Sequence, residues 1–146
     1  MLMYGHDERI AEWVSNHIPH VYEGFEKYIG IGYIVKEKIV AGFIFNDYHA
    51  HFGTIQLSMA ATSPVWAKKN TIKEILRYPF EQLKCYKIFT TTPADNIKAL
   101  KVNEHIGFKQ EAILAHQFGK KRHAVVMRML LPDYNKFLKE NCDGQI

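Results

Sequence analysis

The stretch of this sequence with the clearest potential for chemistry is a basic loop between a strand and a helix. Residues 54–62 alternate polar and apolar side chains as a strand does, and Ser63-Pro64 ends that pattern. The loop 65–70 carries Lys68 and Lys69, and the apolar spacing that follows predicts a helix over 71–84. Because the first N–H groups of a helix lack partners inside it, this loop and helix start could bind an anion.

Polar side chains on the strand before the loop are candidates for lining a reaction cleft. Gln56 and Ser58 point to one side of an extended chain, whereas Leu57 and Met59 point to the other. The alternative is that both polar side chains only hydrogen-bond within a half-buried sheet. The sequence leaves these two interpretations equally open.

Two polar positions have a structural and a functional interpretation. Thr71 and Glu74 fit a capping box, in which the helix start satisfies its own N–H groups. The functional interpretation is that the remaining N–H groups of residues 68–72 face a phosphate. Asn96, which follows Asp95, is expected to cap a second helix or to form an Asx-turn.

The elements around these positions predict one domain over residues 1–146. Asp7 is the expected N-cap of a first helix that ends before Pro19, and residues 20–30 are either a short helix or an aromatic lid. Gly107 ends the helix after Asn96. The order predicts an α/β (α+β) domain with helices flanking one mixed, mostly antiparallel sheet of six or seven strands. The expected strands are 1–5, 32–35, 39–46, 54–62, 85–92, 108–118 and 123–131, and a last helix covers 134–140.

Composition narrows the class of protein. The chain has 146 residues, is 47% hydrophobic and 23% charged, and carries a formal charge of +4, which suits an acidic ligand as well as a surface without a role. Its apolar runs are too short to span a bilayer, and its start does not resemble a signal peptide, so we expect no membrane partner. Cys85 and Cys142 form no disulfide framework, which favours a cytosolic protein with free thiols.

Two further partner classes are not expected. His49 and His51 could share one side of an extended segment, but no third ligand at suitable spacing joins them, so we predict a solvated turn and no metal. Nucleic-acid binding would need a basic stripe with interleaved aromatic residues, which the sequence does not contain.

Three motifs together resemble the GNAT superfamily of acetyl-CoA-dependent N-acetyltransferases over nearly the whole chain. Asn96 and Ala99, followed by a helix that ends in Gly107-Phe108, match the family's Asn-x-x-Ala or Ser helix. The segments 108–114 and 124–130 resemble the strands that follow it in the branch of ribosomal-protein N-terminal acetyltransferases and their bacterial and phage relatives.

The resemblance implies acetyl-CoA as cosubstrate and assigns residues to it. The family's phosphate loop usually reads Arg or Gln, two residues, Gly, one residue, and Gly or Ala. This chain has Ala67, Asn70 and Ile72 at those positions, and Lys68 and Lys69 would supply the charge. Many members carry a tyrosine as general acid at the position of Asn103, which cannot donate a proton in that way. The implied cofactor-binding residues are Ala60, Ala61, Thr62, Ala67, Lys68, Lys69, Asn70, Thr71, Ile72 and Asn96, and the catalytic candidates are Gln56, Ser58 and Asn103.

The predicted reaction is direct attack of an amine on the thioester, with an N–H of residues 60–62 stabilising the oxyanion. An α-amine of pKa ~8 is partly neutral near pH 7 whereas a lysine of pKa ~10.4 is not, which favours an α-amine or a weakly basic small amine. A protein N-terminus, a lysine or a small amine remains open, as does the oligomeric state. The alternative is a non-catalytic acyl-CoA-binding or protein-interaction module. Family position places the acceptor near Glu12, Tyr22, Glu23, Phe25 and Tyr28.

Overall fold

Within the described residues, seven strands form one sheet, and one of its pairings is parallel. The computed structural model describes residues 1–18 and 25–140, and the strand order is β1-β2-β3-β4-β5-β7-β6. Strand β4 pairs with β5 in parallel, and every other neighbouring pair is antiparallel. This confirms the predicted mixed, mostly antiparallel sheet. The strands are β1 (Leu2–Met3), β2 (Tyr28–Val35), β3 (Lys38–His49), β4 (Thr54–Ala61), β5 (Lys87–Pro93), β6 (Lys109–Leu114) and β7 (Ala124–Leu130).

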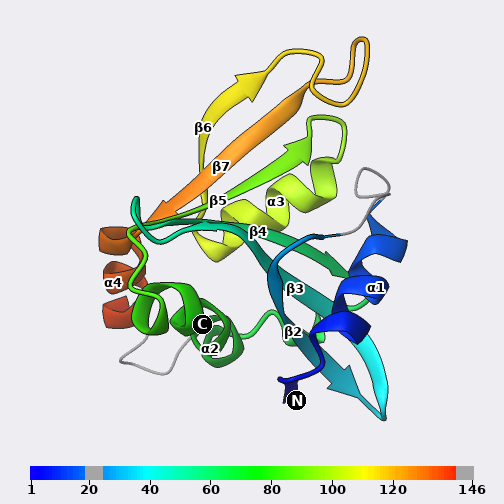
Figure 1. Cartoon of the computed structure of the whole chain (residues 1–146), viewed down its shortest axis with the longest axis vertical. Coiled ribbons are helices and arrows are strands. Elements are labelled where there is room, and N and C mark those ends of the chain that lie inside the picture. The colour runs from blue at the N-terminus through cyan, green and yellow to red at the C-terminus, as the bar shows by residue number, and fades with distance from the viewer. Residues whose placement is uncertain (19–24, 141–146) are drawn as a thin grey trace.

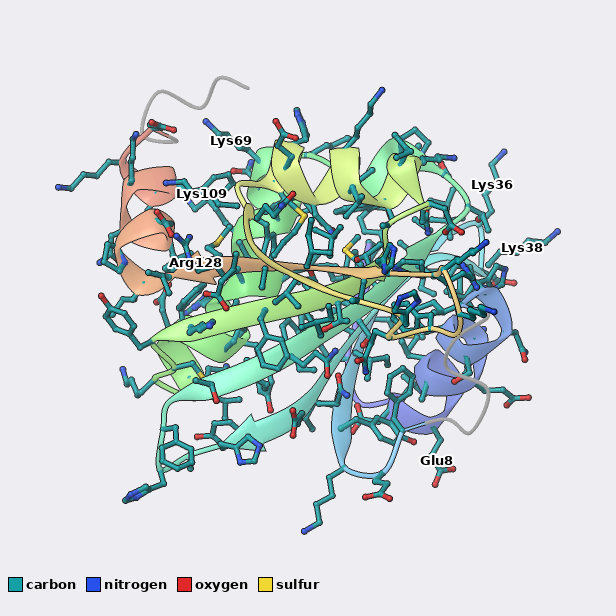
Figure 2. All side chains as sticks on the ribbon, turned by 90° about the horizontal axis from the view of Figure 1, so that it is seen from above. Glu8, Lys36, Lys38, Lys69, Lys109 and Arg128 are labelled. Carbon is teal, nitrogen blue, oxygen red and sulfur yellow. The ribbon has the colours of Figure 1, made fainter. Side chains whose placement is uncertain are left out.

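Helices cover both faces of the sheet. Figure 2 shows α2 and α3 above the sheet and α1 below it. Residues Ile72 and Ile106, from α2 and α3, belong to one apolar cluster with Phe43, and Ile10 of α1 packs in a second cluster with Ile44. The helices are α1 (Asp7–His17), α2 (Lys69–Arg77), α3 (Ile97–Ile106) and α4 (Leu131–Glu140). Among the described helices, none is long and apolar enough to cross a membrane.

Glycines let α1 lie close against the sheet. A Cβ atom at Gly32 would stand 2.4 Å from Ile10 Cδ1, and one at Gly42 would stand 2.5 Å from Val14 Cγ2. The start of α1 is tied down by Asp7, whose Oδ1 accepts the N–H of Gly30 at 3.0 Å. The sequence predicted Asp7 as the N-cap of this helix. In the structure Asp7 is instead the first helical residue, and its carboxylate accepts a hydrogen bond from β2.

The helix predicted over 71–84 is shorter and starts earlier. Helix α2 begins at Lys69 with Lys68 in the cap position and no side-chain cap, so the capping box of Thr71 and Glu74 does not form. After Arg77 the chain makes a π-helical turn, η2 (Tyr78–Gln82), in which Leu83 N–H donates to Tyr78 C=O at 3.0 Å. Pro79 explains the change, because a proline inside a helix has no N–H to continue the regular ladder.

The remaining boundaries differ by a few residues. Strand β5 begins two residues later than predicted, β6 ends at Leu114, and α4 includes Pro132 and Asp133 in its first turn. Gly107 ends α3 at φ +121°, as predicted. Of the segment 20–30, Tyr28, Ile29 and Gly30 belong to β2, and residues 19–24 lie outside the described part of the chain.

Candidate active site

Strands β4 and β5 part after only three paired residues, which opens the middle of the sheet. Their last pair is Gln56 with Phe89, although β4 continues to Ala61 and β5 to Pro93. Each strand keeps its other neighbour, because β4 pairs with β3 and β5 with β7 along their lengths. Figure 1 shows the two strands diverging from a common end. We call this opening the split, and its closed end at Gln56 and Phe89 the apex.

The β4 side of the split presents peptide groups without strand partners. Thr62 N–H donates to Val40 C=O at 2.8 Å, so this pair is a hydrogen-bonded one in the antiparallel register of β3 and β4. Such pairs alternate, which turns the N–H groups of Met59 and Ala61 toward β5. Neither N–H has a hydrogen-bond partner among the described residues. Of the predicted oxyanion segment 60–62, only Ala61 therefore offers a free N–H, and Met59 adds a second.

The β5 side of the split also presents peptide groups without strand partners. Ala94 N–H donates to His123 C=O at 2.8 Å and Leu131 N–H to Tyr86 C=O at 2.8 Å, which fixes the alternation between β5 and β7. By that alternation Thr91 turns its N–H and C=O toward β4. Unpaired backbone N–H and C=O groups are strong hydrogen-bonding groups. An extended ligand in the split could therefore form hydrogen bonds with the backbone of both strands.

The predicted phosphate loop lies beyond the wide end of the split. Strand β4 leads into η1 (Pro64–Trp66), a single 3-10 turn, and Trp66 is buried with its ring 5.0 Å from that of Phe43. Lys68, at the cap position of α2, is exposed, and the first N–H groups of α2 have no side-chain cap. Ile72 sends its side chain into the core, so it does not obstruct the helix start.

The two loop lysines are not equivalent. Lys69 is half-buried, and its Nζ lies 5.5 Å from the ring centroid of Phe137 in α4. This cation–π contact directs Lys69 toward the C-terminal helix. Figure 2 shows Lys69 on the side of the molecule that carries α4. Lys68 is therefore the better placed of the two for a ligand at the helix start.

Helix α3 places the other two candidates differently. Asn96 is the N-cap, and its Oδ1 accepts the N–H of Ala99 at 3.2 Å, which confirms the predicted cap. Its amide NH₂ stays available, since the cap uses only the oxygen. Asn103 is 4% exposed, and its backbone C=O accepts the N–H groups of Gly107 and Phe108. Asn96 could thus contact a ligand at the surface, whereas Asn103 faces the interior.

On the α1 face, polar side chains gather at the apex. Gln56 Nε2 donates to Thr91 Oγ1 at 3.5 Å, and Ser58 Oγ donates to Asn46 Oδ1 at 3.4 Å. Gln56 and Ser58 therefore share one face, as predicted, while Leu57 is buried on the other. Their hydrogen bonds lie within the sheet, and a part in chemistry stays a prediction for both.

A cleft of about 610 Å³ adjoins Gln56. The π-helical turn shapes one wall, because it brings Tyr78 and Leu83 to the cleft, where Leu83 C=O accepts the hydroxyl of Tyr48 at 3.3 Å. The pKa of Tyr28 is raised by burial and by the carboxylates of Glu8 and Asp7, so its phenol remains protonated at neutral pH. Five of the lining residues are aromatic and two are acidic. The lining residues are Phe25, Glu26, Lys27, Tyr28, Ile29, Phe45, Asn46, Asp47, Tyr48, Ile55, Gln56, Tyr78 and Leu83.

Sequence reasoning found part of this cleft and missed the rest. Phe25 and Tyr28 line it as expected, Glu12 is exposed on α1 and does not, and Tyr22 and Glu23 lie outside the described residues. Asp47, Tyr48 and Tyr78 were missed, because they come together only through the bulge in β3 and the π-helical turn. Pro79 was the one signal that could have indicated that turn.

The two histidines expected in a solvated turn are at the surface. His49 Nε2 lies 2.9 Å from Asp47 Oδ1, and His51 is exposed. Across the described residues, no group of three His, Cys, Asp or Glu side chains could hold a metal ion. Cys85 is buried with a free thiol whose pKa is raised by burial, and Cys142 lies outside the described chain.

Comparison with solved structures defines the fold. No protein-family model matches the sequence, and no curated protein matches it. The structure is similar to a point mutant of spermidine N-acetyltransferase SpeG from Vibrio cholerae, with a TM-score of 0.72 and 15% identity over 97% of this chain and 99% of that one. A second mutant of SpeG gives a TM-score of 0.73 and 15% identity over 97% of both chains. A dodecameric form gives 0.71 and 15% identity over 92% of this chain and 95% of that chain.

These similarities and the split between β4 and β5 show that the chain has the fold of the GNAT acetyltransferases. The predicted fold class is thereby confirmed.

Proposed function

We propose that this protein is an N-acetyltransferase that transfers acetyl from acetyl-CoA to an amine by direct attack. The observation that carries the proposal is the split, with its free N–H groups at Met59, Ala61 and Thr91. The uncapped start of α2 lies beyond its wide end, and the cleft with aromatic and acidic residues adjoins its apex at Gln56.

The α2 side suits the nucleotide end of acetyl-CoA. A pyrophosphate at the start of α2 would accept hydrogen bonds from N–H groups of residues 69–71 and would be attracted by the helix dipole and by Lys68. The extended pantetheine arm would then run along β4 and use its free peptide groups as a neighbouring strand would. The residues fit this group, because a basic, uncapped helix start and an unpaired strand edge lie in sequence order.

Transfer needs three contributions from the protein. Holding amine and thioester together removes most of the entropic cost of their encounter. The free N–H of Met59 or Ala61 stabilises the negative charge on the carbonyl oxygen as the amine attacks. The carbon–sulfur bond then breaks, the CoA thiolate leaves, and the ammonium proton passes to solvent. With Asn103 at the family's tyrosine position, the departing thiolate takes its proton from water.

The cleft suits the acceptor amine. Gln56 connects it to the apex, and its lining contains two carboxylates, Glu26 and Asp47, against one lysine, Lys27. Aromatic rings and carboxylates together favour a ligand that carries positive charge. An amine would lose its proton only on moving toward the split. The predicted ribosomal-protein branch implies a protein N-terminus as the acceptor, and the acidic lining suits a small amine as well.

Release of CoA thiol from acetyl-CoA, measured with a panel of amines, tests the function. The panel should hold peptides with free N-termini, an N-terminally blocked lysine peptide and small mono- and diamines. We expect turnover with at least one member. Tight binding of acetyl-CoA without turnover on any acceptor would instead support a non-catalytic acyl-CoA-binding module. The two cysteines favour a cytosolic location with reduced thiols, and this location agrees with the proposed function.

A further inference from the structure

One buried hydroxyl at the apex has no partner. Thr90 is 3% exposed, and its Oγ1 makes no hydrogen bond within the described part of the chain. Thr90 Oγ1 is the only buried side-chain oxygen or nitrogen of the described residues in this condition. An unpaired hydroxyl in an apolar interior is unfavourable, so a native protein that keeps one calls for a physical reason.

The position of Thr90 follows from the register of β5. Phe89 forms the last pair with β4, so Thr90 is the first β5 residue beyond the apex. Its side chain points to the same face as Ile88, which belongs to the core cluster with Leu57 of β4 and Ile106 of α3. The hydroxyl therefore lies on the α2 and α3 face, at the point where the two strands part. Gln56 and Thr91 occupy the opposite face of the same apex.

We propose that Thr90 donates a hydrogen bond to the thioester end of bound acetyl-CoA. The inference rests on the proposed function. A cosubstrate that enters at the start of α2 and runs along β4 brings its thioester toward the apex, where Oγ1 is free to donate. Thr90 keeps its proton, so no proton transfer is required of it. Its hydrogen bond strengthens as negative charge grows on the sulfur, because charged acceptors bind donors more strongly.

This role would complement Asn103. A tyrosine at that position would bring a hydroxyl from α3 toward the sulfur, and Asn103 brings none. A hydroxyl on β5 would instead supply the hydrogen-bond donor that α3 lacks. Sequence reasoning missed Thr90, because a threonine inside a strand is ordinary and only its missing partner marks it.

The substitution Thr90→Val tests the assignment, since valine has nearly the shape of threonine without the hydroxyl. We expect kcat/KM for acetyl-CoA to fall about three- to tenfold, mainly in kcat, which is the effect of losing one hydrogen bond. Thr90→Ser should retain most of the rate. The melting temperature of the unliganded Thr90→Val protein should be unchanged or higher, because an unpaired buried hydroxyl has been removed.

A matched control is Thr92→Val. Thr92 is 8% exposed and points to the same face two residues farther from the apex, and its hydroxyl is not among the unpaired atoms. We expect its kinetic constants to stay within about twofold of the wild type.

Three results would overturn the inference, and they can be told apart. If wild type and Thr90→Val share the same kcat and the same calorimetric Kd for acetyl-CoA, the Thr90 assignment is wrong while the proposed function stands. If the wild type itself does not bind acetyl-CoA, both fail. A lower melting temperature with unchanged kinetics would show that a buried water satisfies Oγ1 and would likewise reject the assignment.

Discussion

Gln56 and Thr91 hydrogen-bond across the line where β4 and β5 separate, with Gln56 Nε2 3.5 Å from Thr91 Oγ1. This contact closes the apex on the cleft side, immediately beyond the last backbone pair of the two strands. In the proposed function, an amine that moves from the cleft toward the split passes this contact, because Gln56 lies between the two.

Gln56→Ala should lower kcat/KM for the amine about tenfold, because the apex would lose its polar side chain on the acceptor side. KM for acetyl-CoA should change little. Ser58→Ala should cost less, since Ser58 bonds to Asn46 on the β3 side, away from β5. Initial rates with each substrate varied in turn measure both. Equal losses for the two variants would show that the apex contact has no special part.

Lys68→Ala should weaken acetyl-CoA binding, and the loss should shrink as salt rises, because exposed charges are screened. Lys69→Ala is the matched control, since Lys69 lies against Phe137 and should matter less to the ligand. Calorimetric Kd values at low and high salt compare the two. An unchanged Kd for Lys68→Ala at low salt would remove this lysine from the phosphate site.

Asn96→Ala should cost about 1 kcal/mol of unfolding free energy, since it removes the cap of α3. If the free amide also contacts the pantetheine arm, the folded variant will bind acetyl-CoA more weakly as well. Denaturant unfolding and calorimetry on the same preparation separate the two effects. A variant that melts earlier and binds normally would leave Asn96 with the cap alone.

The fold was predictable where the local residue pattern decides the secondary structure. The site was predictable where its parts come from two elements that are consecutive in the sequence. The order of strand, loop and helix over 54–84 shows in the apolar spacing, although the helix runs only from Lys69 to Arg77. The cap at Asn96 was predictable from its residue type. The split, the cleft and the orphan hydroxyl of Thr90 depend on register between distant strands. The capping box predicted for Thr71 was wrong. Helix α2 starts at Lys69, two residues before Thr71, so Thr71 is not at the cap position.

Asp95 and Arg122 link the start of α3 to the loop between β6 and β7, with Arg122 Nε and a terminal nitrogen each 3.1 Å from an Asp95 oxygen. The hydrogen bond from Arg122 lowers the pKa of Asp95 below its usual value. A lowered folded pKa contributes stability above the unfolded pKa of about 4, and that contribution disappears as pH falls through the folded value. Asp95→Asn should therefore flatten the acid limb of the stability curve slightly. Identical acid limbs would mean that the pair is not formed in solution.

With Asn at position 103, kcat/KM should climb as the acceptor amine deprotonates. It should lack the alkaline fall that loss of a tyrosine proton near pH ~10 would produce. The profile must be recorded with protein stability checked at each pH. A clear descending limb in folded protein would show that another group protonates the leaving thiolate.

Calorimetric titration of the protein with acetyl-CoA measures whether the split and the start of α2 bind the cosubstrate. We expect saturable binding with one site per chain, an affinity that falls with rising salt, and a weaker Kd in Lys68→Ala. We also expect that the bound ligand is consumed when an accepted amine is added, with release of free CoA thiol. If no saturable binding occurs at millimolar acetyl-CoA, the split and the uncapped start of α2 do not form an acetyl-CoA site, and the proposed function is wrong.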